Sequence, residues 1–206
     1  MQEMTFFTAR ALPLHAVNRL LAMRSQIDPM KEFLVLLVVL FPLLAIASSS
    51  AQSPELKVVP SVDLKRYTGK WYEIARLPNR FQKDCAAAVT ATYTLLPDGK
   101  IGVLNQCLDA SGKEKSAKGK AKVADKATNA KLRVTFFWPF YGDYWILDLG
   151  PDYEYAVVGE PKRRYCWILS RTQQMEESLY TELLARIAKQ GYDTHGFIRT
   201  PAQPGR

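Results

Sequence analysis

The chain has 206 residues, of which 48% are hydrophobic and 23% are charged, and its formal net charge is +8. This is the composition of an ordinary globular protein, and one domain is the natural expectation. The positive charge does not indicate nucleic-acid binding. The basic residues form no block of five or six, and we find no zinc-ligand spacing, RNP-like aromatic motif or recognition-helix pattern.

The first 51 residues are interpreted as an N-terminal extension that contains a signal peptide. Met30 begins the charged MKE that precedes the apolar run FLVLLVVLFPLLAIA at 33–47. That run has the length of a secretory core and is short for a membrane span. Ser49 and Ala51 fit the small-x-small rule, so we expect cleavage after Ala51. Met30 is the expected true start, and an uncleaved anchor is the alternative.

Residues 52–206 are therefore expected to form one exported domain, in the periplasm or secreted. No cysteine follows the apolar run, so the lipid-modified cysteine of a bacterial lipoprotein is absent, and association with the outer membrane stays open. In an oxidising compartment two of the three cysteines can pair. Cys85 and Cys107 flank a predicted hairpin and are the better pair. Cys166 is expected to be a buried or half-buried free thiol. No metal site is expected, because the two histidines supply no nearby ligand.

Short alternating runs dominate this domain. In VTATYTL, for example, Val89, Ala91 and Tyr93 share one face, as in a half-buried strand. The following Pro-Asp-Gly at 97–99 favours a turn, since proline presets φ and glycine tolerates a positive φ. The even spacing of such runs predicts an antiparallel sandwich or barrel. The predicted strands are residues 70–76, 89–95, 101–107, 116–123, 131–137, 144–150, 153–159 and 164–171, with WPFYGD at 138–143 as an interruption and a short strand at 197–200.

A helix is predicted over 175–191, after the main strands. Leu179, Leu183 and Ile187 recur at helical spacing, acidic residues occupy the first turn, and Gly191 follows the end. A single apolar stripe of this kind is expected to pack on the outside of the sheet.

A basic stretch, KEKSAKGKAK, covers 113–122. Its lysines alternate with small residues, as on the solvent face of a strand. Two interpretations remain open, a solvated face or a weak attraction toward anionic lipid headgroups at a membrane surface.

The faces expected to point inward mix large aromatic side chains with small ones and a lone amide. An eight-stranded barrel is just wide enough to hold one small ligand, so these residues are candidates for a cavity wall. The alternative is an ordinary packed core in which the polar ends of these aromatic side chains form hydrogen bonds within the protein. The candidate ligand-binding residues are Tyr93, Asn105, Phe136, Tyr144 and Trp167.

The stretch GKWYEI predicts the base of such a barrel. Gly69 allows the entering strand to pass close to its neighbours, and Trp71 can then plug the end. Arg171 shares the inward face with Trp167, so its guanidinium is expected to stack on the indole of Trp71. This floor is interpreted as structural, leaving a cup that is open at the other end.

Three motifs carry a family resemblance: GKWYEIARLPNRFQ at 69–82, PDY at 151–153 and WILSRT at 167–172. In order and spacing, and with the helix that follows, they resemble the motifs of lipocalins, above all the bacterial outer-membrane (Blc) and apolipoprotein D-like members. The resemblance covers about 60–201. It implies an all-β fold, an eight-stranded antiparallel up-and-down barrel with one C-terminal α-helix packed outside.

The resemblance also implies a binding protein without a cofactor, not an enzyme. Members carry fatty acids, lysophospholipids and other small hydrophobic molecules, and bacterial members are associated with envelope lipid storage, transport or repair. Some relatives dimerise, so a homodimer is possible. The alternative is a thiol-dependent isomerase of the lipocalin type that uses Cys85 or Cys107, although neither has a histidine nearby in sequence.

Overall fold

The computed structural model describes residues 55–202. The expected signal peptide, its cleavage after Ala51 and the start at Met30 lie outside these residues.

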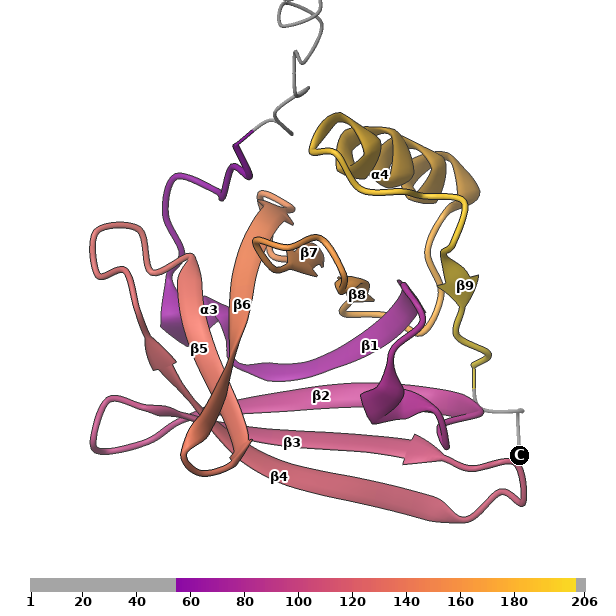
Figure 1. Ribbon diagram of the computed structural model, residues 1–206, viewed down its shortest axis with the longest axis horizontal. Coiled ribbons are helices and arrows are strands. Elements are labelled where there is room, and N and C mark those ends of the chain that lie inside the picture. Colours follow the sequence, from indigo (N-terminus) through magenta and orange to yellow (C-terminus); the bar gives the residue numbers. More distant parts are fainter. Residues whose placement is uncertain (1–54, 203–206) are drawn as a thin grey trace, which may run out of the picture. The chain divides into compact units, whose positions relative to one another are not determined.

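Eight antiparallel strands close into a barrel (Figure 1). Neighbouring strands pair in chain order from β2 to β8, β8 pairs with β1, and β1 pairs back onto β2, with Trp71 opposite Ala91. The predicted eight-stranded antiparallel barrel is confirmed. The strands are β1 Gly69–Arg76, β2 Ala87–Leu95, β3 Ile101–Leu108, β4 Glu114–Val123, β5 Lys131–Phe137, β6 Phe140–Leu149, β7 Tyr155–Gly159 and β8 Cys166–Ser170.

The interruption expected at 138–143 is wrong in extent. Only Trp138 and Pro139 form the turn, and β6 begins at Phe140. Gly142 and Asp143 favour turns as isolated residues, but here they pair with Val134 and Arg133 inside the β5–β6 ladder. The ladder overrides local preference because each paired residue gains cross-strand contacts.

The helix α4, Glu177–Lys189, packs on the outside of the barrel, as predicted (Figure 1). Its buried side chains are Tyr180, Leu183 and Ile187, and they join an outer core with residues of β7 and β8 such as Val157 and Ile168. A second core lies inside the barrel around Trp71 and Tyr93. The fold therefore has two apolar layers, one on each side of the sheet.

Three shorter elements complete the described chain. The one-turn helix α3, Leu64–Tyr67, precedes β1 and is capped by the side chain of Asp63. The 3₁₀ turn η2, Arg80–Gln82, lies in the loop between β1 and β2. The strand β9, Ile198–Arg199, pairs with β1 at Ala75 and Arg76.

Because the strands alternate in direction, their connections lie at two ends. We call the end with α3 and the connections 96–100, 124–130 and 150–154 the floor end. The far end carries the connections 77–86, 109–113, 138–139 and 160–165. Among residues 55–202, none of the helices has the length and the hydrophobicity that a membrane span requires.

Candidate functional site

The floor end is closed by an indole and a guanidinium. Trp71 is completely buried, and the central carbon of the Arg171 guanidinium lies 3.8 Å from the centre of its ring. Gly69 stands next to this pair with a φ of +94°, a value that favours glycine, and a Cβ there would lie 3.3 Å from Arg171 Nη1. The structure thus brings together the three residues proposed for the floor.

Backbone carbonyls hold the floor arginine in place. Its nitrogens donate to the carbonyl oxygens of Lys70 at 3.0 Å, Arg66 at 2.7 Å and Tyr153 at 3.2 Å. Partial burial lowers the pKa of Arg171 from its usual value. The indole Nε1 of Trp71 donates to the carbonyl oxygen of Tyr67 at 2.9 Å, so both members of the stack have their polar groups satisfied.

Three tyrosines meet just above the floor. The hydroxyl of Tyr144 lies 2.8 Å from that of Tyr67 and 2.9 Å from that of Tyr93. Burial raises the pKa of Tyr93 to about 12 and raises those of Tyr67 and Tyr144 well above the usual value. All three hydroxyls therefore stay neutral at physiological pH.

The tyrosine cluster has a hydrogen to spare. Three hydroxyls carry three hydrogens, and the two hydrogen bonds of the cluster use two of them. Among residues 55–202 no other acceptor bonds to these hydroxyls, so one O–H remains without an acceptor in the described chain. Sequence reasoning identified Tyr93 and Tyr144 but missed Tyr67, which comes from α3 rather than from a strand.

Asn105 contributes an acceptor to the same interior wall. It faces Ala91 on β2 and Ala117 on β4, and its Oδ1 is buried without a hydrogen-bond partner in the described chain. A buried acceptor without a partner is unfavourable, by about 1–3 kcal/mol, unless something donates to it. The two alanines beside it have small side chains, so the inner wall projects little on either side of the amide.

Phe136 crosses the neighbouring strand at a glycine. A Cβ on Gly119 would lie 2.9 Å from Phe136 Cδ1 and 2.7 Å from the carbonyl oxygen of Thr135, so only glycine fits beneath the ring. Phe136 itself remains partly exposed and packs against the interior core.

The fifth candidate residue, Trp167, lies beneath the 77–86 loop. Its Nε1 donates to Gln82 Oε1 at 2.8 Å, and Gln82 Nε2 donates to Glu73 Oε2 at 2.5 Å. Glu73 also forms a buried ion pair with Arg76 at 2.6 Å and accepts from the hydroxyl of Thr200. This network fixes the loop and the β9 segment to β1.

Sequence reasoning missed the Glu73–Arg76 pair, although a signal was present. After Lys70, Glu73 and Arg76 are the two charged residues of β1, and they lie three residues apart, where strict alternation would put them on opposite faces. A register shift between Glu73 and Ala75 changes the alternation, so both side chains join one network.

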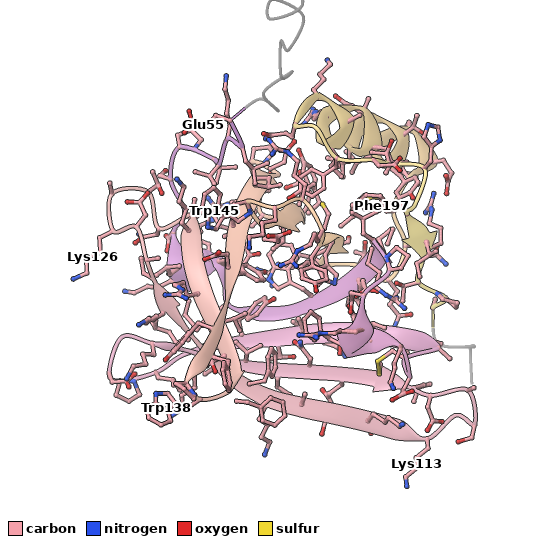
Figure 2. All side chains as sticks on the ribbon, viewed as in Figure 1. Glu55, Lys113, Lys126, Trp138, Trp145 and Phe197 are labelled. Atoms are coloured by element: carbon pink, nitrogen blue, oxygen red, sulfur yellow. A yellow bond between two sulfur atoms is a disulfide. The ribbon has the colours of Figure 1, made fainter. Side chains whose placement is uncertain are left out.

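The predicted disulfide is confirmed. Cys85 and Cys107 are joined, and the bond, drawn in yellow in Figure 2, ties the end of the 77–86 loop to β3. Neither sulfur is then free to act as the nucleophile that the isomerase alternative requires. Cys166 is a free and fully buried thiol, and burial raises its pKa far above the usual value, which disfavours the reactive thiolate. Among residues 55–202, no three potential metal ligands cluster together.

Comparison with known proteins gives consistent matches. The family model "Lipocalin-like domain" matches residues 62–202. The chain is 44% identical over 158 residues to temperature-induced lipocalin-1 of Arabidopsis thaliana, covering 73% of this chain and 84% of that protein. It is 42% identical over 164 residues to outer membrane lipoprotein Blc of Escherichia coli K12, covering 79% and 92%.

Two more distant matches agree with these. Apolipoprotein D of Mus musculus is 34% identical over 157 residues, covering 71% of this chain and 80% of that protein. Among solved structures, insecticyanin from the tobacco hornworm Manduca sexta aligns with a TM-score of 0.59 at 22% identity, over 72% of this chain and 85% of that one. At that identity the structural match is evidence for the fold alone.

Proposed function

The chain belongs to the lipocalin family, and on that premise we propose that its barrel binds one small hydrophobic ligand, such as a fatty acid or a lysophospholipid, and carries it in the cell envelope. Sequestration and release would serve membrane maintenance. The protein acts by binding and needs no cofactor.

One observation carries this proposal: the buried Oδ1 of Asn105 has no partner among the described residues. A core built only for stability would replace such an amide with an apolar side chain, because an unsatisfied buried acceptor is costly. A ligand that donates to this oxygen removes the cost on binding. The amide is thus better explained by a bound molecule than by packing.

The tyrosine cluster supports the same class of ligand. Its spare hydrogen can be donated to a ligand oxygen, and Tyr93 and Asn105 lie on adjacent strands with their side chains on the same face. A group that both donates and accepts fits this pair of features. The protonated carboxyl group of a fatty acid and the free hydroxyl of a lysophospholipid are such groups.

The remaining wall supplies the apolar contact. Phe136, Trp167 and the aliphatic side chains between them can cover a hydrocarbon chain. Each buried methylene contributes about 0.8 kcal/mol, so about ten of them give roughly 8 kcal/mol before the costs of association. Affinity in the micromolar range is expected.

An exported location is supported by the Cys85–Cys107 bond, because disulfides persist in oxidising compartments. The relative from Escherichia coli is named an outer membrane lipoprotein. We propose that this chain is located in the periplasm or is secreted, and association with the outer membrane is the more specific alternative.

Native mass spectrometry of the purified protein, followed by organic extraction, tests the proposal. One lipid-sized adduct per barrel is expected, and the same spectrum reports whether two copies pair. A protein that carries no adduct, and takes up none when mixed with fatty acid or lysophospholipid, would contradict it.

A further inference from the structure

The tip of the β5–β6 hairpin exposes large aromatic side chains. Phe137, Trp138 and Phe140 are 80%, 82% and 78% exposed, more than any other large apolar side chain of residues 55–202. Figure 2 labels Trp138 at this tip, at the outer edge of the barrel. The tip is held by pairing of Phe137 with Phe140, so the three side chains are presented by an ordered turn. Clustered exposed aromatics of this kind mark an interaction surface.

Positive charge without an ion-pair partner in the described chain extends along β4, the strand that pairs with β5 next to this tip. Lys118, Lys120 and Lys122 alternate along β4 with side chains that face inward, and so they share its exposed outer face. None of the three forms an ion pair within 4.0 Å with a carboxylate of residues 55–202. The outer face continues through Tyr141, whose ring centre lies 4.7 Å from Lys122 Nζ and 5.5 Å from the Arg133 guanidinium carbon.

The hairpin tip also has a defined position relative to the floor. It belongs to the far end, opposite the Trp71–Arg171 stack that closes the barrel. The 77–86 loop lies at the same end and exposes Phe81 by 62%. Whatever binds the tip therefore meets the end through which a ligand would enter.

We infer that the β5–β6 tip, residues 137–140 with Lys118, Lys120 and Lys122, is a docking surface for a lipid bilayer with anionic headgroups. Aromatic side chains favour the membrane–water interface, and lysines are attracted to anionic headgroups there. Charge complementarity favours this occupant over a second copy of the chain. A two-fold contact that buries this surface would bring two positively charged surfaces together. This inference rests on the proposed function. It adds that docking directs the transfer of ligand between the barrel and the bilayer.

Vesicle sedimentation tests the inference. The chain from Gln52 onward is used, since the closed barrel and both cores lie within residues 55–202. It is mixed with phosphatidylcholine vesicles with or without phosphatidylglycerol. The aromatic variant carries Phe137→Ser, Trp138→Ser and Phe140→Ser, and its matched control is Leu95→Ser, an exposed apolar side chain at the floor end. Unchanged thermal melting verifies that each variant is folded.

A second pair of variants isolates charge. Lys118→Gln, Lys120→Gln and Lys122→Gln are combined, and the control removes the same net charge elsewhere, through Lys65→Gln, Lys126→Gln and Lys189→Gln. Binding to anionic vesicles is expected to weaken about fivefold for each lysine removed near the tip at low salt. The control is expected to weaken binding much less, and high salt is expected to remove the difference.

The expected results are binding to anionic vesicles, a loss of roughly tenfold or more in the aromatic variant, and a blue shift of tryptophan emission that Trp138→Phe abolishes. The inference is overturned if the aromatic variant binds vesicles as well as Leu95→Ser does. It is also overturned if the parent protein self-associates without binding vesicles and the tip variants abolish that self-association. Ligand titration without vesicles tests the proposed function separately, so ligand binding and bilayer docking can be contradicted independently of each other.

Discussion

The guanidinium of Arg171 lies over the indole of Trp71, with its central carbon 3.8 Å from the ring centre, and also donates to three backbone carbonyls at the floor end. The two residues come from the first and last parts of the barrel. Their contact therefore joins the strands where the sheet closes on itself.

Replacing this arginine should destabilise the whole barrel. Arg171→Ala removes the stack and leaves the carbonyls of Arg66, Lys70 and Tyr153 without their donor, so we expect a loss of about 2–4 kcal/mol in the free energy of unfolding. Urea unfolding measures it. Arg186→Ala is the matched control, because the Arg186 ion pair with Glu182 is exposed and the one with Asp148 is only partly buried, so together they should contribute about 1 kcal/mol. Equal losses in the two variants would contradict a special role for the floor.

Asn105→Leu should separate stability from ligand affinity. It replaces an unsatisfied buried acceptor by an apolar side chain of similar size, so the free energy of unfolding without ligand is expected to stay equal or rise by about 1 kcal/mol. Affinity for a fatty acid is expected to fall about five- to tenfold, because one hydrogen bond is lost. Gln106→Leu, on the outer face of the same strand, should leave affinity unchanged. If the Asn105→Leu variant binds fatty acid as tightly as the parent, Asn105 does not contribute to the ligand site.

Removing the disulfide should lower stability without changing the count of reactive native thiols. For a separation of 22 residues, Cys85→Ser with Cys107→Ser is expected to lose about 3 kcal/mol. Thiol titration of the oxidised protein should find one thiol, Cys166, and only after unfolding, because it is fully buried. Three thiols reactive in the folded, oxidised protein would reopen the isomerase alternative.

The tyrosine cluster should make the protein sensitive to alkali. Burial raises the pKa of Tyr93 from 10.0 to about 12, so above pH 10 the unfolded chain releases this proton while the folded chain keeps it. Stability from this source is therefore complete below pH 10 and is lost as the pH rises toward 12, at up to about 1.4 kcal/mol per pH unit for each such tyrosine. Urea unfolding across this range, with ultraviolet titration of phenolate, measures both effects. Tyr93→Phe should unfold with a shallower pH dependence, and an unchanged slope would argue against the assignment.

The architecture could be predicted from sequence because the signal repeats. Alternating runs, turn residues and three motifs along the chain all indicate one closed barrel, and the family with its Blc and apolipoprotein D-like relatives follows from the same motifs. The helix was also predictable, since one apolar stripe can only pack against the outside of a sheet whose strands are already paired.

Other features depend on contacts that no local pattern encodes. Tyr67 precedes the first strand, and only the barrel's closure brings its hydroxyl to Tyr144. Glu73 and Arg76 share a network because of a register shift, which alternation cannot reveal. The extent of the β5–β6 turn was misjudged for a similar reason, because Gly142 and Asp143 are turn formers held by a ladder.

The most direct test of the account is equilibrium titration of the chain from Gln52 onward with a fluorescent fatty acid. We predict saturable binding of one molecule per barrel at micromolar concentration, displaced by unlabelled fatty acid. Ala117→Trp, which places a large ring on the inner wall opposite Asn105, should abolish binding, whereas Lys118→Trp on the outer face of the same strand should not. Absence of saturable binding in the parent, or equal binding in both tryptophan variants, would contradict a ligand inside the barrel.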